Sequence, residues 1–276
     1  MRAILENITI FLIRNTFLGR GFLRKYSIKF LVDNFLNKDS HSSTTVPSKV
    51  VKISNIPFKF YFDALSNLSK FVGKDDRVEI NFLKDNLPDD FVFIDIGANN
   101  GFYTQMLLAE HKNKTVGKII SIEPNPLMCE RILENISLLG EEVIQNKKLY
   151  DIENCAVGES NEKAYLDQSL GYGQARLSKK SEGNITVNTR PLLDIINSRM
   201  ISKIDCLKID VEGYEMNILK PFFMNAPSSL YPNKIVIEYT HNEQWEDINF
   251  IEFLSLEYDY SVVGKTAGNI LLEYEG

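Results

Sequence analysis

The order of the apolar segments from residue 91 onward constrains the fold more than any other feature of the chain. Residues 91–96, FVFIDI, form an apolar run that one acid interrupts, which is typical of a strand buried on both faces. Residues 118–122 have the same character, and apolar residues with helical spacing follow each of these two runs. Further strand patterns lie at residues 151–157, 205–209, 234–239, 260–263 and 269–273, and helical patterns lie near 191–199, 214–220 and 245–257. This alternation predicts an α/β fold with a mostly parallel sheet between two layers of helices.

Length and composition agree with one large domain preceded by an extension. The chain has 276 residues, of which 44% are hydrophobic and 25% are charged, so we expect a substantial core. The formal net charge of -6 at pH 7 argues against a nucleic-acid binder, which needs a concentrated basic face. Cys129, Cys155 and Cys206 lie far apart without a CxxC pair, so we expect neither a zinc site nor a disulfide framework. The sequence therefore predicts a protein of the reducing cytoplasm.

Residues 1–45 differ from the rest of the chain and are predicted to form a helical extension. Apolar and basic residues are interleaved there, and the longest apolar run, residues 8–13, is too short to cross a bilayer. Two interpretations remain open. The extension is either a pair of helices packed on the main domain or a segment in peripheral contact with an anionic membrane surface.

Residues 46–276 are predicted to form the main domain, and residues 46–90 lead into it. Patterns rich in β-forming residues lie at 50–53 and 58–62, on either side of Asn55, Ile56 and Pro57. Such a pattern predicts a hairpin whose turn lies at those three residues. A polar helix is expected to follow over residues 77–86.

A glycine-containing turn lies directly after the first strand of the main domain. Residues 95–104 read DIGANNGFYT, and Gly97 and Gly101 allow the backbone to turn tightly and to approach a ligand closely. A helix begins just beyond, so its free N–H groups face the crevice at the strand end. Glu123 ends the second strand, where an acid is well placed to accept hydrogen bonds from both hydroxyls of a ribose. The combination predicts a cofactor of the adenosine type.

The chemistry of the turn favours S-adenosylmethionine (SAM) over a dinucleotide. Dinucleotide enzymes admit a pyrophosphate through G-x-G-x-x-G, whereas this turn reads G-x-x-x-G. Asp95 beside the turn disfavours a phosphate and suits a cationic group such as an ammonium or a sulfonium. Ala156 is expected to lie against the adenine. The candidate cofactor-binding residues are Asp95, Gly97, Asn99, Gly101, Thr104, Glu123, Asn125 and Ala156.

Acids also follow two later strands, where they indicate a second part of the same site. Asp210, Glu212 and Glu215 come after the strand over 204–209, and Glu238 ends the next strand, shortly before His241. Methylation of an alcohol requires the hydroxyl proton to leave, so a base nearby is useful. We therefore predict that Asp210, Glu238 and His241 are catalytic and handle the acceptor hydroxyl.

Two alternatives for these acids remain open. Glu212 and Glu215 stand at the start of a helix, whose N-terminus favours negative charge, so they can act as caps. Asp210, Glu212 and Glu238 also offer the hard oxygen ligands that Mg²⁺ prefers, which makes a magnesium site a second hypothesis. The spacing of the three acids matches no dedicated metal-binding loop.

The motifs together resemble the FkbM family of SAM-dependent methyltransferases. The resemblance is carried by residues 95–101 (DIGANNG), 122–125 (IEPN), Asn135 and 207–215 (LKIDVEGYE), and it covers about residues 50 to 240. It implies a Rossmann-like sheet of seven strands whose last strand is antiparallel. It also implies methyl transfer from SAM to oxygen, with a hydroxyl of a sugar, glycan or other natural product as acceptor. Residues 1–45 fall outside it.

Other functional classes remain as alternatives. A non-catalytic module with the SAM-binding fold would bind glycans or partner proteins, but it would have no reason to keep the glycine turn and the acids. A NAD-dependent dehydrogenase would require the dinucleotide fingerprint, which the turn lacks. The sequence names neither the acceptor nor the oligomeric state.

Overall fold

The computed structural model describes residues 46, 48–61, 76–111, 117–167, 176–178, 185–242, 245 and 250–276. They belong to two compact units, one over residues 1–76 with 170–173, and one over residues 77–169 with 174–276. The predicted extension over residues 1–45 lies outside the described residues. Both of its interpretations, the helix pair and the membrane-surface segment, therefore stay predictions.

The described part of the first unit is a β-hairpin, as the sequence predicts. β1 (Ser48–Ile53) pairs antiparallel with β2 (Ile56–Tyr61). The predicted position of the turn is wrong, because Ser54 and Asn55 form it, with φ of 49° and 69°. Positive φ at both central residues is the geometry of a two-residue hairpin turn, which Asn tolerates well. Pro57 lies within β2 opposite Lys52, a position open to proline in a sheet of two strands.

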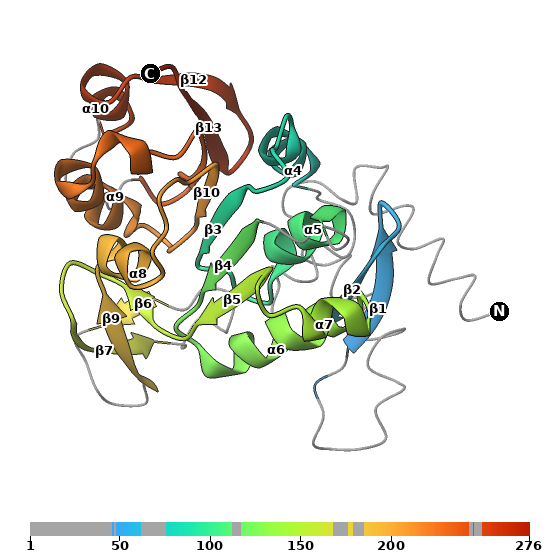
Figure 1. Ribbon diagram of the computed structural model, residues 1–276. Helices are drawn as coiled ribbons and strands as arrows, with labels where there is room; N and C mark the ends of the chain where they lie inside the picture. Colours follow the sequence, from blue (N-terminus) through green and yellow to red (C-terminus); the bar gives the residue numbers. More distant parts are fainter. Residues whose placement is uncertain are drawn as a thin grey trace, which may run out of the picture. The chain divides into compact units, whose positions relative to one another are not determined.

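The second unit is built around a seven-stranded sheet (Figure 1). Its strands are β3 (Val92–Ile96), β4 (Lys118–Ile122), β5 (Tyr150–Glu153), β10 (Cys206–Ile209), β11 (Lys234–Glu238), β12 (Tyr260–Lys265) and β13 (Asn269–Tyr274). They are arranged in the order β12-β13-β11-β10-β3-β4-β5, in which β13 pairs antiparallel with both β11 and β12 and the other pairs are parallel. The predicted fold class is thus confirmed, including the antiparallel last strand.

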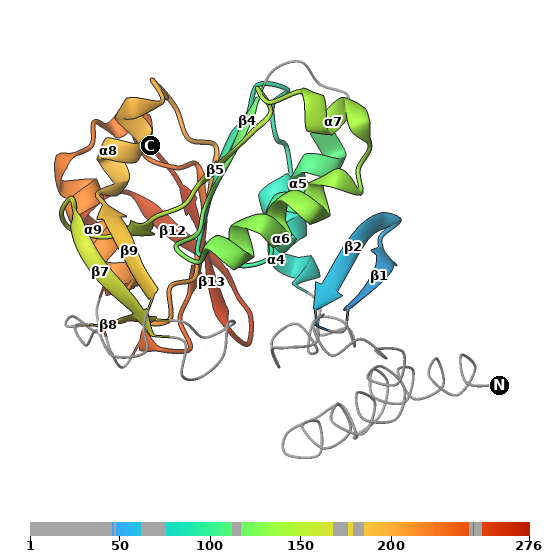
Figure 2. The same cartoon turned by 90° about the horizontal axis from the view of Figure 1, so that it is seen from below.

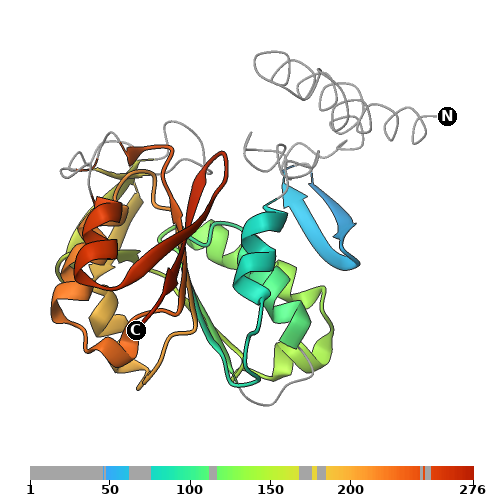
Figure 3. The same ribbon diagram turned by 90° about the horizontal axis from the view of Figure 1, so that it is seen from above.

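Helices cover both faces of this sheet, which is seen nearly edge-on in Figures 2 and 3. One layer contains α5 (Phe102–His111) and α6 (Pro126–Ser137), with α4 (Arg77–Lys84) and the short α7 (Glu141–Gln145) beside them. The other contains α8 (Leu192–Ser198), α9 (Glu215–Asn225), a 3-10 turn (Ser228–Leu230) and α10 (Phe250–Glu257). Apolar residues of β3, β4, β10 and β11 pack on this second layer to form the main core. Among the described helices, none combines the length and apolarity needed to span a bilayer.

A smaller sheet lies between β5 and α8 in the sequence, and the sequence patterns did not predict it. Its strands are β6 (Ala156–Val157), β7 (Glu162–Asp167), β8 (Arg176–Ser178) and β9 (Ile185–Arg190), in the order β6-β9-β7-β8. The single strand expected over 151–157 is divided, because β5 pairs with β4 whereas β6 pairs with β9. β7 and β9 carry few buried side chains, so their apolar periodicity is weak.

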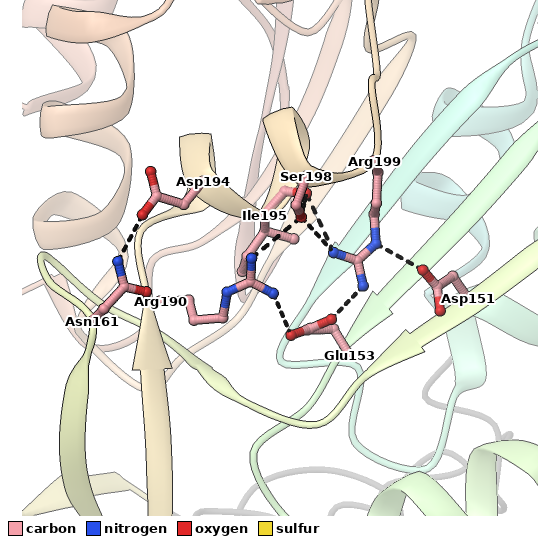
Figure 4. Close-up of polar contacts among 8 residues, drawn as sticks. All are labelled: Asp151, Glu153, Asn161, Arg190, Asp194, Ile195, Ser198 and Arg199. Atoms are coloured by element: carbon pink, nitrogen blue, oxygen red, sulfur yellow. Dashed lines mark hydrogen bonds and ion pairs between the residues drawn. The ribbon is translucent and has the colours of Figure 1, made fainter.

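A network of ion pairs joins β5 to β9 and to the end of α8 (Figure 4). Arg199 donates to Asp151 at 2.7 Å and also to Glu153, while Arg190 donates to the other oxygen of Glu153 at 2.7 Å. Burial acts to raise the pKa of Glu153, but the bonds from Arg199 and Arg190 outweigh it, so this pKa lies below its ordinary value. The two arginines thus hold the edge strand of the large sheet against the following elements.

Substitution of Arg199 by Met is expected to lower the free energy of unfolding by about 1–3 kcal/mol. The change leaves the carboxylate of Asp151 without its guanidinium partner and that of Glu153 with Arg190 alone. Thermal and denaturant unfolding would measure it, with Lys203→Met as the control, because the Lys203 side chain is 40% exposed in its pairs with Asp90 and Asp205, whereas that of Arg199 is 12% exposed. Equal losses in the two variants would contradict a special contribution from the network.

Candidate functional site

At two positions of the glycine turn between β3 and α5, the backbone conformation and the neighbouring atoms permit only glycine. Gly97 and Gly101 have φ of 72° and 79°, and Asn99 between them has φ of 51°. A Cβ at Gly97 would lie 2.0 Å from the carbonyl oxygen of Asp210, and a Cβ at Gly101 would lie 3.1 Å from the side chain of Ile132. The turn is therefore packed between the end of β10 and α6, which explains both glycines of the motif.

Hydrogen bonds from α5 and α6 fix the turn. Gly97 N–H donates to the carbonyl of Ile122 at 3.0 Å, which ties the turn to the end of β4. The Asn135 amide donates to the carbonyl of Asn100 at 2.9 Å, and Gln105 donates to the carbonyl of Asn135 at 2.7 Å. Asn135 thus acts by holding the turn, a role that depends on the packing of α6 beside it.

Glu123 is buried at the end of β4, directly beside the turn. Its carboxylate accepts hydrogen bonds from the backbone N–H of Asn99 at 2.8 Å and of Asn125 at 2.9 Å. Burial raises the pKa of Glu123 to about 7, against the opposing effect of these two bonds, and the negative charge of Asp95 adds to the rise. Additional donors from a ligand would therefore favour the ionised form of this carboxylate.

Asp95 and Thr104 form hydrogen bonds with each other, and these bonds stabilise the glycine turn. Asp95 Oδ2 accepts from the backbone N–H of Thr104 at 3.2 Å and from its hydroxyl at 2.8 Å. The Thr104 hydroxyl also lies 2.7 Å from that of Ser121 on β4. These contacts join the end of β3 to the start of α5. Direct contact of Asp95 and Thr104 with a cofactor stays a prediction.

Asn125 and Ala156 have structural contacts of their own. The side chain of Asn125 caps α6 by accepting from Leu127 N–H at 3.0 Å, while its buried Nδ2 has no hydrogen-bond partner among the described residues. Ala156 packs with Leu166 and Val187 in a small apolar cluster of the second sheet. A buried donor without a partner is available to a ligand. The adenine contact of Ala156 stays a prediction.

The structure brings Asp210 and Glu238 to the same edge of the sheet as the glycine turn. β10 and β11 are parallel neighbours, with Ile209 opposite Ile237, so the two acids that follow stand side by side. Glu238 Oε1 accepts from Thr240 N–H at 3.1 Å, and its buried Oε2 has no hydrogen-bond partner among the described residues. Burial raises the pKa of Glu238 to about 8, and the negative charges of Asp210, Glu215 and Glu212 add to the rise.

His241 and Glu215 are engaged by other side chains. His241 Nε2 lies 3.0 Å from a carboxylate oxygen of Glu212. Glu215 is fully buried at the start of α9, where it accepts from the backbone N–H of Val211 and Gly213 and from Trp245 Nε1. The capping alternative therefore holds for Glu215, whereas Glu212 orients the predicted base His241.

The magnesium hypothesis receives no support from the arrangement of these acids. Asp210 Oδ2 lies 2.9 Å from the ammonium of Lys208, and Glu212 is paired with His241. Across the described ranges, no group of three or more His, Cys, Asp or Glu side chains could hold a metal ion. Asp210, Glu212 and Glu238 therefore do not fit a Mg²⁺ site.

Three residues of the site were missed from the sequence. Gln105 secures Asn135, and Lys208 pairs with Asp210. Asn154 donates to the carbonyls of Glu123 at 2.9 Å and Pro124 at 3.0 Å, so it fixes the loop that presents Glu123. Lys208 belongs to the motif over 207–215, which was the one available signal. Gln105 and Asn154 lie in no motif, because their partners are set by packing.

Comparison with known proteins agrees with this architecture. The pattern of the Methyltransferase FkbM domain matches residues 95–262. A hexuronic acid methyltransferase of Haloferax volcanii is 26% identical over 159 residues, which are 58% of this chain and 60% of that protein. The crystal structure of the methyltransferase FkbM from Methylobacillus flagellatus KT has the same fold, with a TM-score of 0.50 and 19% identity over 75% of this chain and 52% of that one. Since the domain pattern matches more than half of its residues, the chain belongs to the FkbM methyltransferase family.

Proposed function

We propose that the protein transfers a methyl group from SAM to a hydroxyl of a sugar, glycan or other natural product. Family membership supports methyl transfer, and the relative named as a hexuronic acid methyltransferase supports a sugar-type acceptor. The observation that carries the proposal concerns Glu238, one carboxylate oxygen of which is buried and has no hydrogen-bond partner among the described residues. This oxygen lies at the sheet edge that also holds the glycine turn. A carboxylate with a raised pKa at such a place suits proton transfer.

The cofactor side of the site consists of the turn and Glu123. Gly97, Gly101 and Asp95 shape the pocket for the methionine part, where Asp95 adds negative charge beside cationic groups. Glu123 accepts hydrogen bonds from the ribose hydroxyls through the remaining lone pairs of its carboxylate. The buried Nδ2 of Asn125, which has no hydrogen-bond partner in the described part of the chain, supplies a further donor next to Glu123. SAM, when bound, supplies a methyl group on a sulfonium, so that the leaving group is neutral.

The acceptor side consists of Asp210, Glu238 and the pair of His241 with Glu212. The acceptor oxygen would take the methyl group that bound SAM supplies, with S-adenosylhomocysteine as the leaving group, and the hydroxyl proton would pass to Glu238. A carboxylate with a pKa near 8 is a stronger base than an ordinary Glu, so it takes this proton more readily. Asp210 accepts a hydrogen bond from the hydroxyl and keeps it in line, and His241 lies nearby as a second base.

Mass spectrometry after incubation with methyl-labelled SAM would test the proposal. The acceptor panel should contain neutral glycosides, hexuronates and amino sugars of the same chain length. Labelled product with any of them would support the proposal, and the Asp210→Asn variant controls for background methylation. Tight SAM binding without transfer to any acceptor would instead favour the non-catalytic module.

Replacement of Glu123 by Gln is expected to weaken SAM binding by about 1–3 kcal/mol, because the ribose hydroxyls lose a charged acceptor. Since the pKa of Glu123 is about 7, the SAM affinity of the wild type should fall as the pH drops below 7, where the carboxyl becomes protonated. The Gln variant should lack this pH dependence. Calorimetry at pH 6 and pH 8.5 would measure both effects, with Glu130→Gln at an exposed position of α6 as the control. Equal affinities in wild type and variant would remove Glu123 from the ribose role.

A further inference from the structure

Lys208 is a buried lysine in the middle of the large sheet. It lies in β10 between Leu207 and Ile209, whose side chains belong to the main apolar core. Because side chains alternate along a strand, Lys208 faces the opposite side, where its Nζ lies 5.1 Å from the ring centroid of Tyr103 on α5. The residue is only 3% exposed. A buried ammonium is strongly unfavourable unless charged or polar groups compensate it.

The groups that compensate the charge of Lys208 belong to both the cofactor side and the acceptor side of the site. Lys208 Nζ lies 2.9 Å from Asp210 Oδ2, and the two side chains are 4% and 35% exposed. On the neighbouring strand β3, Lys208 stands opposite Asp95 in the register. Its charge also acts on Glu123, where it opposes the larger effect of burial on the pKa. One cation thus lies close to the acids of the cofactor side and of the acceptor side.

The backbone of Asp210 is fixed, and its carboxylate is paired with Lys208. Asp210 N–H donates to the carbonyl of Ile96 at 3.1 Å, and its own carbonyl packs against Gly97. The side chain reaches toward solvent beyond the strand end, where an exposed ion pair would hold it only weakly. Lys208 cannot turn to water, because its stem and ammonium are enclosed by the sheet and Tyr103. The ion pair is therefore retained.

We propose that Lys208 is a positioning residue for the methyl transfer and that it holds the ionised carboxylate of Asp210 between the glycine turn and the acceptor site. The inference rests on the proposed function and deepens it. Each carboxylate oxygen has two lone pairs, so Asp210 held in this way can still accept a hydrogen bond from the acceptor hydroxyl. The charge of Asp210 also acts on Glu238, where it helps to raise the pKa of the proton acceptor. Lys208 thereby influences both carboxylates of the acceptor side without touching the substrate.

Kinetics of Lys208→Met and Lys208→Arg at pH 8.5 would test the inference. This pH lies above the pKa of about 7 of Glu123 in the wild type, and the Kd for SAM in each variant reports any further rise of that pKa when the charge of Lys208 is removed. We expect Lys208→Met to lower kcat by about 10- to 100-fold while the Kd for SAM stays within about threefold, and Lys208→Arg to recover most of the loss. Lys203→Met, at a lysine just before the same strand whose partners Asp90 and Asp205 have no role in the proposed site, should have wild-type kinetics. A wild-type kcat in Lys208→Met would overturn the inference.

A double-variant comparison separates this role from simple loss of stability. If Lys208 acts through Asp210, Lys208→Met combined with Asp210→Asn should be no slower than Asp210→Asn alone, within about twofold. Losses that multiply would overturn the inference. Lys208→Gln serves the same comparison if the Met variant does not fold.

A readout independent of activity distinguishes failure of the inference from failure of the proposed function. The crystal structure of the Lys208 variant should show the carboxylate of Asp210 turned away from its wild-type position. An unchanged Asp210 side chain would overturn the inference even if the enzyme is active. A wild type that transfers no methyl group contradicts the proposed function, whatever the structure of the variant shows.

Discussion

Replacement of Glu238 by Gln is expected to lower kcat by about 10²- to 10⁴-fold, the usual range for a lost acid–base group, while the Kd for SAM stays within about threefold. The amide keeps the shape of the side chain and its bond from Thr240 N–H, but it cannot take up the hydroxyl proton. Glu238 lies on the acceptor side, so the cofactor contacts of the glycine turn are unaffected. Initial rates with saturating SAM would measure the loss.

The pH dependence adds a second signature for Glu238. A base must be ionised to act, so kcat of the wild type should rise with pH up to about 8, the pKa of Glu238, and then level off. Stability should change in the opposite direction. The folded-state pKa is raised above the ordinary value, so the stability contributed by Glu238 is present at low pH and is lost as the pH rises through 8. We therefore expect the Gln variant to have a higher Tm than the wild type at pH 9, though it is less active.

A matched control lies at the other end of the same strand pair. Glu273 on β13 stands opposite Lys234, the first residue of β11, whereas Glu238 is its last. Glu273→Gln makes the same chemical change away from the site, so it should keep the wild-type kcat and pH profile. Wild-type turnover in Glu238→Gln would show that the proton leaves by another route, such as His241 or solvent.

Substitution of Gly97 by Ala is expected to abolish measurable SAM binding and to lower the free energy of unfolding by about 2–4 kcal/mol. The new methyl group would lie 2.0 Å from the carbonyl oxygen of Asp210, and the φ of 72° is itself unfavourable for alanine. Asp210 cannot move away easily, because its N–H is bonded to the carbonyl of Ile96. The turn must therefore shift, which displaces its N–H groups and Glu123, the groups that we propose to bind the cofactor.

Calorimetry and denaturant unfolding would measure the two effects of Gly97→Ala. The control is Gly264→Ala on β12, where a Cβ would meet Leu271 at an ordinary distance of 3.5 Å. That variant should bind SAM like the wild type. Normal SAM affinity in Gly97→Ala would mean that the turn adapts to a side chain, and the proposed cofactor site would have to lie elsewhere.

Much of the fold was predictable because it depends on local periodicity. The apolar runs over 91–96 and 118–122 correspond to β3 and β4, and the turn between β3 and α5 lies at the two glycines of the motif. The hairpin turn was misplaced by about one residue, since Asn55 and Pro57 are both common in turns and the register decides between them. The small sheet was missed because β6 and β8 are short and because β7 and β9 have few buried side chains, so burial leaves little pattern in their sequence.

The sequence by itself determined which side chains stand at the strand ends, because parallel strands place their carboxyl ends at one edge and the chain order fixes which residues follow. Asp95, Glu123, Asp210 and Glu238 were all found in this way. Only the tertiary structure decided what each acid does there. Register and packing between elements distant in sequence bind Glu215 to Trp245 and Glu212 to His241, and leave one oxygen of Glu238 buried and unbonded among the described residues. Burial and neighbouring charge set the pKa of Glu238, and both are properties of the assembled sheet.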